Sequence, residues 1–178
     1  MRLRIGLGSV VVMAWLFSPA GTAIAQDGSC ALPGTLKTVI ATRYSGSKLV
    51  SSEDLDRGDR ALFQKDHGNH CPGLVKVDFY GDGRPTLALV LMVSTGGKES
   101  AELIVAHEIG QKWETVLLDT AESSVPVAWS QGPGKYEDVY GEKTILATRP
   151  VVVFCGYNSW AILYAWTGNK VTKIWLRD

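Results

Sequence analysis

Two aspartates and a threonine lie in one short stretch of the chain, in a pattern that suits a hard cation. Asp78, Asp82 and Thr86 follow one another at intervals of four residues, with Gly81 and Gly83 between them. Carboxylate oxygens are ligands that Ca²⁺ prefers, but calcium takes six to eight oxygens and these side chains supply few of them. The pattern predicts a loop that calcium stabilises weakly. The alternative is a β-turn in which the glycines take positive φ and the aspartates accept hydrogen bonds from turn amides.

The same stretch resembles the calcium-loop segment of FG-GAP or VCBS-type repeats, which read roughly Asp-x-Asn-Gly-Asp-Gly-x-Pro-Asp-Leu before a strand. Tyr80 and Thr86 replace two expected ligands, and the positions that match are Asp78, Gly81, Asp82, Gly83 and Pro85. The segment occurs once, so a propeller of several repeats is not supported. The resemblance implies a secreted adhesive or binding module. The whole chain is similar to uncharacterised exported bacterial proteins that contain one such segment. This resemblance implies no particular activity.

A second polar stretch contains two histidines and a cysteine. His67, His70 and Cys71 are residue types that bind zinc or copper. A zinc site needs four ligands at suitable spacings, and a cysteine in a disulfide does not act as a thiolate ligand. A polar loop ordered by a disulfide is the simpler interpretation.

No residue pattern predicts nucleophilic catalysis. Ser159 follows Gly156 but lacks the second glycine of the Gly-x-Ser-x-Gly elbow. His107 has the strand parity of Leu103 and Val105, which favours a half-buried structural histidine. We assign no catalytic residue and lean against an enzyme.

Aromatic residues alternate along a predicted strand near the C-terminus. Trp160, Ile162, Tyr164 and Trp166 share one face of this strand by its period of two. Large rings dominate core burial, so the core is the expected place for this face. The alternative is an exposed aromatic platform for a glycan or a protein partner. We expect Tyr157, in the preceding turn, to be the most exposed of the group, and we name Tyr157 and Trp160 as candidate binding residues.

The first 25 residues have the features of an export signal. Arg2 and Arg4 precede an apolar run over residues 10–17, and Ala23 and Ala25 form a small-x-small cleavage pattern. The apolar run is shorter than the ~20 residues that span a bilayer. The sequence therefore predicts a signal peptide at residues 1–25 and one exported domain at residues 26–178, in the periplasm or outside the cell. No stable membrane span is expected after cleavage.

The cysteine and charge content agree with export. Export favours disulfides, and of Cys30, Cys71 and Cys155 the last lies in an apolar run typical of a buried strand. We predict a Cys30–Cys71 bridge, with Cys71–Cys155 as the alternative. Removal of Arg2 and Arg4 leaves sixteen basic residues against eighteen acidic ones. This balance gives no support for a nucleic-acid partner.

The remaining pattern is dominated by strands. One helix is predicted over residues 51–66, where Leu55, Leu62 and Phe63 share a face. Residues 35–41 alternate enough to predict a first strand, and residues 131–141 are expected to form a loop. Further strands are predicted at 74–79, 86–93, 103–109, 113–118, 125–129, 144–147, 151–155, 160–166 and 171–176. The expected fold is α+β or mainly β: one domain, an antiparallel meander or sandwich-like sheet with one short helix.

Three functions fit these observations. The first is an exported, non-catalytic binding module for an unknown protein or glycan, with calcium as the one cofactor to consider. The second is a secreted hydrolase that uses a loop carboxylate or a histidine pair. The third is a structural accessory protein of the cell envelope.

Overall fold

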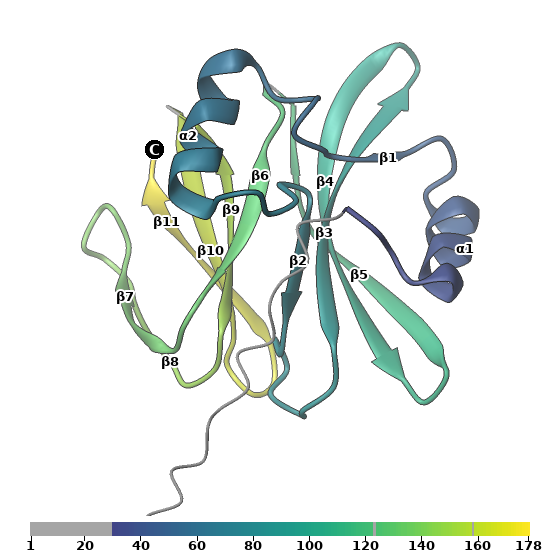
Figure 1. Cartoon of the computed structure of the whole chain (residues 1–178). Coiled ribbons are helices and arrows are strands. Elements are labelled where there is room, and N and C mark those ends of the chain that lie inside the picture. Colours follow the sequence, from purple (N-terminus) through teal and green to yellow (C-terminus); the bar gives the residue numbers. More distant parts are fainter. Residues whose placement is uncertain (1–29, 123, 158) are drawn as a thin grey trace, which may run out of the picture.

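Two antiparallel sheets stack face to face to form a β-sandwich (Figure 1). The computed structural model describes residues 30–122, 124–157 and 159–178, so the signal peptide predicted at residues 1–25 lies outside the described part. Sheet A contains β1 (Lys48–Leu49), β2 (Leu74–Val77), β3 (Thr86–Thr95), β4 (Lys98–Ile109) and β5 (Lys112–Ala121). Sheet B contains β6 (Val127–Gln131), β9 (Val151–Gly156), β10 (Trp160–Trp166) and β11 (Val171–Arg177). This confirms the predicted antiparallel, β-rich domain.

Each sheet is built mainly from a meander. In sheet A the order is β1-β3-β4-β5, with β2 beside the other half of β3. Strands β4 and β5 form a hairpin, in which Ile109 pairs with Lys112 and Gly110 has a φ of 67°, a value that glycine adopts readily. In sheet B the order is β11-β10-β9-β6, so β5 and β11 are edge strands on one side of the sandwich.

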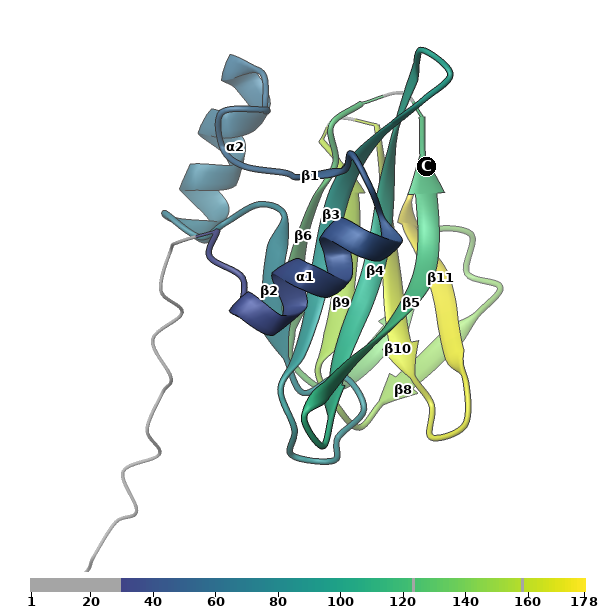
Figure 2. The ribbon, with the colours of Figure 1, turned by 90° about the vertical axis from the view of Figure 1, so that its right-hand side faces the viewer.

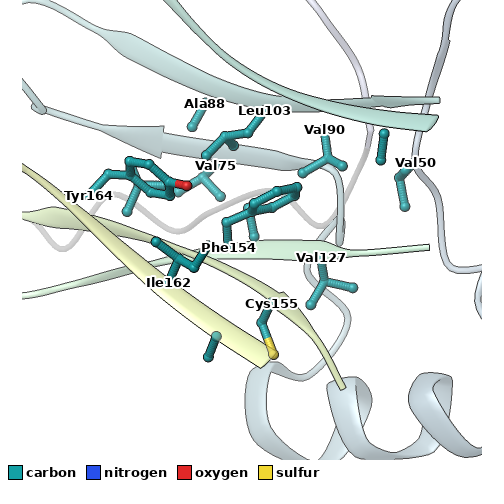
Figure 3. Packing of buried hydrophobic residues seen from close by; sticks show 14 of the residues in the cluster. Val50, Val75, Ala88, Val90, Leu103, Val127, Phe154, Cys155, Ile162 and Tyr164 are labelled. Carbon is teal, nitrogen blue, oxygen red and sulfur yellow. The ribbon is translucent and has the colours of Figure 1, made fainter. Parts of the chain in front are cut away.

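The main core lies between the two sheets (Figure 3). Alternate residues of each strand point inward, because successive side chains of a strand lie on opposite faces. Sheet A contributes Val75, Ala88, Val90, Leu103 and Val105, and sheet B contributes Val152, Phe154, Ile162 and Tyr164. Ile162 and Tyr164 are buried, whereas Trp160 and Trp166 at the strand ends are half-buried and pack against this core. The prediction that this aromatic face packs on the core is therefore confirmed.

The outer face of sheet A is covered by a helix (Figure 2). Residues 35–41, predicted as a strand, form part of α1 (Gly34–Arg43), so that prediction is wrong. Leu36 and Ile40 are four residues apart and share one helix face, which packs on Leu87, Leu89 and Leu91 of β3. The alternation in this segment favoured a strand, but the apolar surface that sheet A offers to Leu36 and Ile40 selects the helix.

The predicted helix over residues 51–66 is shorter than expected. Helix α2 (Arg57–His67) begins after Asp56, whose side chain accepts a hydrogen bond from the Asp59 amide at 2.9 Å. Residues 51–54 form a separate turn, in which the amide and hydroxyl of Ser51 both donate to Asp54 at 2.8 Å. Ser51 and Asp54 therefore close a turn that precedes the helix. Phe63 of α2 enters the main core at one end of the sandwich.

A two-stranded hairpin covers the outer face of sheet B. It consists of β7 (Gly134–Glu137) and β8 (Thr144–Ala147), so the prediction of a loop over residues 131–141 missed β7. Ile145 and Ala147 of β8 pack on Val153, Leu163 and Ile174 of sheet B. Helix α1 and the hairpin therefore cover much of the two outer faces, although Leu117 on the outer face of β5 stays exposed.

The sheets are joined by backbone hydrogen bonds at the β2–β6 edge. The Pro72 carbonyl accepts from the Ala128 amide at 2.8 Å, and the Gly73 carbonyl accepts from the Val90 amide at 2.9 Å. The Val90 carbonyl in turn accepts from the Val50 amide at 2.9 Å. We call these residues, 50, 72, 73, 90 and 128, the backbone junction. It ties β3 of sheet A to β6 of sheet B.

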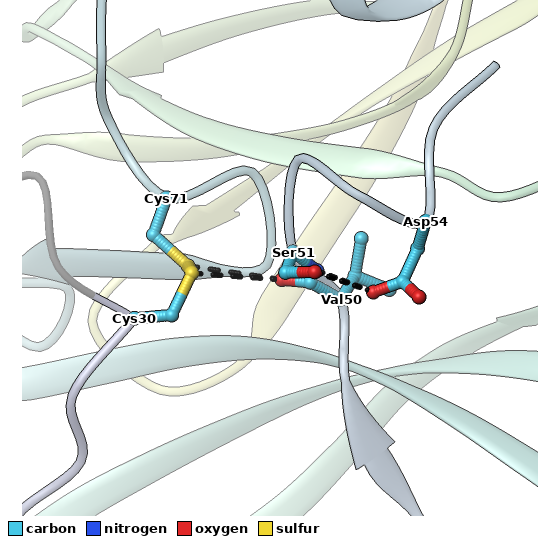
Figure 4. The surroundings of a disulfide bond; sticks show 5 residues. All are labelled: Cys30, Val50, Ser51, Asp54 and Cys71. Atoms are coloured by element: carbon cyan, nitrogen blue, oxygen red, sulfur yellow. Dashed lines mark hydrogen bonds between the residues drawn. A yellow bond between two sulfur atoms is a disulfide. The ribbon is translucent and has the colours of Figure 1, made fainter.

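The predicted disulfide fastens Cys30, the first residue that the structure describes, to this junction (Figure 4). Cys30 and Cys71 are bonded, with their Cα atoms 5.2 Å apart, and Cys155 is a free, buried thiol. The Sγ atom of Cys71 lies 3.7 Å from the Val50 carbonyl oxygen. The bridge therefore closes a loop of the chain on the residues that join the sheets.

Substitution of Gly73 by alanine should destabilise the protein strongly. An added Cβ would lie 2.3 Å from the Val50 carbonyl oxygen, which its hydrogen-bonded strand holds in place. We expect a loss of about 3 kcal/mol in the free energy of unfolding, as for overpacked sites, measured by urea denaturation. Gly132→Ala is the control, because no atom lies within 4 Å of its added Cβ. Equal stability of the two variants would contradict the close packing of Val50 on Gly73 at the backbone junction.

Reduction of the disulfide should lower the free energy of unfolding without unfolding the protein. Its sequence separation is 41 residues, and closure of such a loop stabilises by about 4 kcal/mol through the entropy of the unfolded chain. We expect urea denaturation to show that reduction lowers the free energy of unfolding of the wild type by about this amount. A Cys30→Ser, Cys71→Ser double variant should match the reduced protein and not respond to reductant. A Cys155→Ser variant should keep the full response to reductant, because Cys155 is a free thiol. Loss of the response in that variant would indicate the Cys71–Cys155 pairing.

Candidate functional site

The 78–86 loop is a turn at the end of the sandwich where β2 passes into β3, at the bottom of Figure 1. The Asp78 carboxylate accepts from the Gly83 amide at 3.2 Å, and Asp82 accepts from the Arg84 amide at 3.1 Å. Gly81 and Gly83 have φ values of 67° and 76°. These are the contacts expected of the β-turn alternative.

Asp82 also faces a histidine of the neighbouring strand. His107 Nε2 lies 3.0 Å from Asp82 Oδ2, close enough for an ion pair when the imidazole carries a second proton. Burial opposes ionisation of Asp82, but the Arg84 amide and the nearby His107 and Arg84 outweigh it and lower the pKa of this carboxyl. The His107 ring packs on Tyr80, with centroids 4.6 Å apart. This agrees with the structural role expected for His107.

An arginine from the other sheet secures the same turn. Arg149, between β8 and β9, donates a hydrogen bond to the Tyr80 carbonyl. Gly81 is favoured by its positive φ, and a Cβ at this position would require the end of the Arg149 side chain to move. Tyr80 further packs edge-on against Trp166 of β10, with centroids 5.1 Å apart. The turn therefore connects the two sheets at this end.

The calcium prediction for Asp78, Asp82 and Thr86 stays a prediction. One oxygen of each aspartate is held by a turn amide, and Thr86 is fully buried, with its hydroxyl unpaired among the described residues. Within residues 30–122, 124–157 and 159–178, no three His, Cys, Asp or Glu side chains form a group that suits a metal.

The second polar stretch is divided between two roles. Cys71 is in the disulfide, and His67 packs between Phe63 and Trp129, with centroids at 4.9 and 4.7 Å. Burial lowers the pKa of His67, which favours the neutral ring in this apolar contact. His70 is exposed. The interpretation as a loop ordered by a disulfide fits this arrangement.

Asp78 and His70, which belong to different sequence motifs, line one cavity of about 540 Å³. This cavity runs along β2 and is also lined by Arg84 and by Ser130 of β6. A second cavity of about 240 Å³ shares His70 and Ser130 with it and reaches His67 and Trp129. The loop carboxylate and histidine pair considered for a hydrolase are thus brought near one edge of the sandwich.

The two candidate binding residues have different environments. Tyr157, expected to be the most exposed aromatic, is half-buried and its hydroxyl is inaccessible and unpaired among the described residues. Burial, reinforced by Asp66 of α2, raises the pKa of Tyr157 to about 12. Tyr157 is thus half-buried like Trp160 and Trp166, because the turn after β9 lies close to α2 and not in open solvent. Trp160, by contrast, lines a groove.

This groove lies at the edge of the sandwich opposite the backbone junction, between β5 and β11, which are labelled in Figure 2. Its volume is about 280 Å³. We call it the aromatic groove, and its lining consists of Asp119, Thr120, Ala121, Glu122, Phe154, Trp160, Ile162, Lys173 and Trp175. Trp160 and Trp175 are half-buried. Phe154 packs edge-on against Trp160, with centroids 4.9 Å apart and planes at 66°.

A polar pair connects the two walls of the aromatic groove. Asp119 of β5 accepts hydrogen bonds from Lys173 Nζ at 2.9 Å and from the Tyr164 hydroxyl. Burial opposes ionisation of Asp119, but these bonds and one from the Thr120 amide hold the pKa of the carboxyl below its ordinary value. Burial and the adjacent carboxylate raise the pKa of Tyr164. The pair is therefore a charged carboxylate and ammonium beside two indoles.

Sequence reasoning found Trp160 but missed the residues opposite it. Asp119 and Lys173 are 54 residues apart, and nothing in either strand's local pattern indicates the contact. A β-bulge between Leu103 and Ile104 places Asp119 opposite Leu103 and so on the inner face. For Trp175 a signal was available, because it lies on the strand that returns beside Trp160.

Comparison with known proteins adds no relative: no protein-family model, curated protein or solved structure matches the chain. Neither helix in the described part of the chain is long and apolar enough to cross a membrane.

Calcium should stabilise the 78–86 loop only weakly, because turn amides and His107 already hold its aspartates. We expect the melting temperature of the 26–178 protein to agree within about 1 °C in calcium and in EDTA. An Asp82→Ala variant should melt lower in both buffers. Saturation at 100-fold above Kd would give about 2.7 kcal/mol, which is a rise of several degrees. A rise of that size, lost in the variant, would establish a calcium site.

Proposed function

We propose that the protein is an exported, non-catalytic binding module whose ligand occupies the aromatic groove. The observation that carries this proposal is the placement of two half-buried indoles, Trp160 and Trp175, beside the Asp119–Lys173 pair at an open edge of the sandwich. Binding sites commonly combine apolar and aromatic walls with a few placed polar groups. The aromatic groove has this composition.

The rigidity of the groove supports a binding role. Trp160 is held by Phe154, and Asp119 is held by three hydrogen-bond donors. Groups that are already ordered lose little freedom when a ligand binds, and more of the contact energy is therefore available for affinity. Aromatic residues in such positions carry much of the energy of many interfaces.

The surroundings of the candidate nucleophile support the non-catalytic part of the proposal. The Ser159 hydroxyl donates to the Gly156 carbonyl at 3.0 Å, whereas activation needs a base within hydrogen-bond reach. His107 is in contact with Asp82 in the turn at the far end of β4. The Cys30–Cys71 bridge supports export, since disulfides persist in oxidising compartments, as does the leader pattern of residues 1–25.

The hydrolase alternative has one supporting observation, which is that Asp78 and His70 line the same cavity. The structural accessory alternative requires a partner for an outer surface instead of the groove. Both alternatives place the important residues away from Trp160 and Trp175, so groove variants separate them from the binding module.

Immobilised 26–178 protein should retain a component of the cell envelope through the aromatic groove. We expect a Trp160→Ala, Trp175→Ala double variant to lose this retention, because each indole supplies apolar contact area that alanine lacks. Trp113→Ala is the matched control: this half-buried tryptophan packs on the α1 side of sheet A. The measurement is retention of separated envelope protein and glycan fractions, with all variants first checked for folding by urea denaturation.

Retention by the double variant equal to that of the wild type would overturn the groove as the binding site. Release of hydrolysis products in the same assay, lost in an Asp78→Asn variant, would favour the hydrolase alternative over the binding module.

A further inference from the structure

We propose that the aromatic groove binds a short, uncharged segment of a saccharide chain, with a sugar ring stacked on Trp160 or Trp175 and its hydroxyls on Asp119 and Lys173. This rests on the proposed function and names the ligand class. The argument uses the chemistry of the two walls and the size of the groove.

The groove offers a hydrogen-bond acceptor and a donor side by side. An ammonium has three N–H donors and a carboxylate has about four lone-pair positions. Lys173 gives one donor to Asp119, and its side chain is 51% exposed. Asp119 receives three hydrogen bonds from within the protein, and 20% of its side chain remains exposed. A ligand at this pair therefore meets a donor and an acceptor about one hydrogen bond apart.

Neighbouring hydroxyls of a sugar ring match such a pair, because each hydroxyl both donates and accepts. The C–H face of the same sugar ring is apolar, and it suits stacking on the flat indoles of Trp160 and Trp175. The indoles come from β10 and β11, whereas Asp119 comes from β5. A ring in the groove would therefore contact apolar groups of one sheet and polar groups that span both.

The charges of the groove disfavour the other ligand classes. The carboxylates of Asp119 and Glu122 outnumber the Lys173 ammonium, so the lining disfavours an anion, and a cation would have to compete with Lys173 for Asp119. A wholly apolar ligand would remove water from the Asp119–Lys173 pair without replacing its hydrogen bonds, which is unfavourable. A neutral ligand rich in hydroxyls avoids each of these costs.

The size of the groove indicates a part of a chain. Its volume of about 280 Å³ falls just below the range usual for pockets that enclose a whole drug-sized ligand, roughly 300–1,000 Å³. The groove lies along the edge between β5 and β11, so a longer chain is free to continue beyond it. We infer that it holds a short segment of an oligosaccharide.

The absence of a side chain at Gly156 leaves the space in which the Trp160 indole lies. A Cβ there would lie 2.9 Å from Trp160 Nε1 and 2.7 Å from Ser124 Oγ. Gly156→Ala should therefore shift the indole without removing it. This substitution separates the position of the ring from its presence, which the alanine variants of the tryptophans do not.

The test is a titration of the 26–178 protein with cellotetraose, chitotetraose and maltotetraose, and with tetragalacturonate as the charged comparison. Binding is followed by calorimetry and by tryptophan fluorescence. We expect at least one neutral tetrasaccharide to bind and tetragalacturonate to bind more weakly. Trp160→Ala and Trp175→Ala should each weaken binding at least about tenfold, as for residues at the centre of an interface. Gly156→Ala should weaken it less.

The polar pair has its own variants. Lys173→Met removes the donor and should weaken binding about tenfold, whereas Lys173→Arg keeps a donor and should restore most of the affinity. Trp113→Ala should bind like the wild type. Urea denaturation of every variant separates a loss of contact from a loss of folding.

The outcomes distinguish this inference from the proposed function. If no neutral tetrasaccharide binds but envelope proteins are retained through Trp160 and Trp175, the ligand is a protein: the inference fails and the binding module stands. If neither a saccharide nor an envelope protein binds, both the inference and the proposed function fail. Saccharide binding that the tryptophan variants leave unchanged would also overturn the inference, because it would place the site elsewhere.

Discussion

The structure depends on the backbone junction at Pro72 and Gly73. Two consecutive carbonyls reach different sheets there, Pro72 to β6 and Gly73 to β3, and Val50 packs so closely on Gly73 that a methyl group would not fit. Backbone hydrogen bonds of this kind fix position more firmly than side-chain packing, since the groups have no rotamers to change. The Cys30–Cys71 bridge contacts the same point. One edge of the sandwich is therefore closed by the main chain.

The opposite edge is held differently, and this difference creates the groove. Between β5 and β11 the connection is made by side chains, with Asp119 bonded to Tyr164 and Lys173. Side chains leave space between them that a backbone junction does not. Because α1 and the β7–β8 hairpin cover much of both outer faces, the edges are where a ligand reaches inner-face residues. The placement of the proposed site follows from this layered arrangement.

Local sequence was sufficient for features that depend on neighbours along the chain. The strands from β2 to β6, the β4–β5 hairpin at Gly110 and the aromatic core face of β10 follow from period-two patterning and turn residues. The strand predicted at residues 35–41 failed because the apolar surface of sheet A, formed far along the chain, selects a helix. The candidate site was predicted only in part. Trp160 has a local signal, whereas the contact of Asp119 with Lys173 exists only once the sheets have stacked. Tyr157 is half-buried because α2 packs near its turn.

The burial of Cys155 has a consequence for how the oxidised protein is formed and kept. Burial raises the pKa of this thiol to about 11, despite Arg177 nearby, so at pH 8 only about a thousandth is the reactive thiolate. The thiol is buried inside β9, opposite Val127 of β6, and Val127 adjoins Ala128 of the backbone junction. Because the thiol is buried and mostly protonated, its exchange with the Cys30–Cys71 bridge is slow in the folded protein. Once folded, the chain retains its native pairing without a further catalyst, and any reshuffling is confined to molecules that have not yet assembled the sandwich.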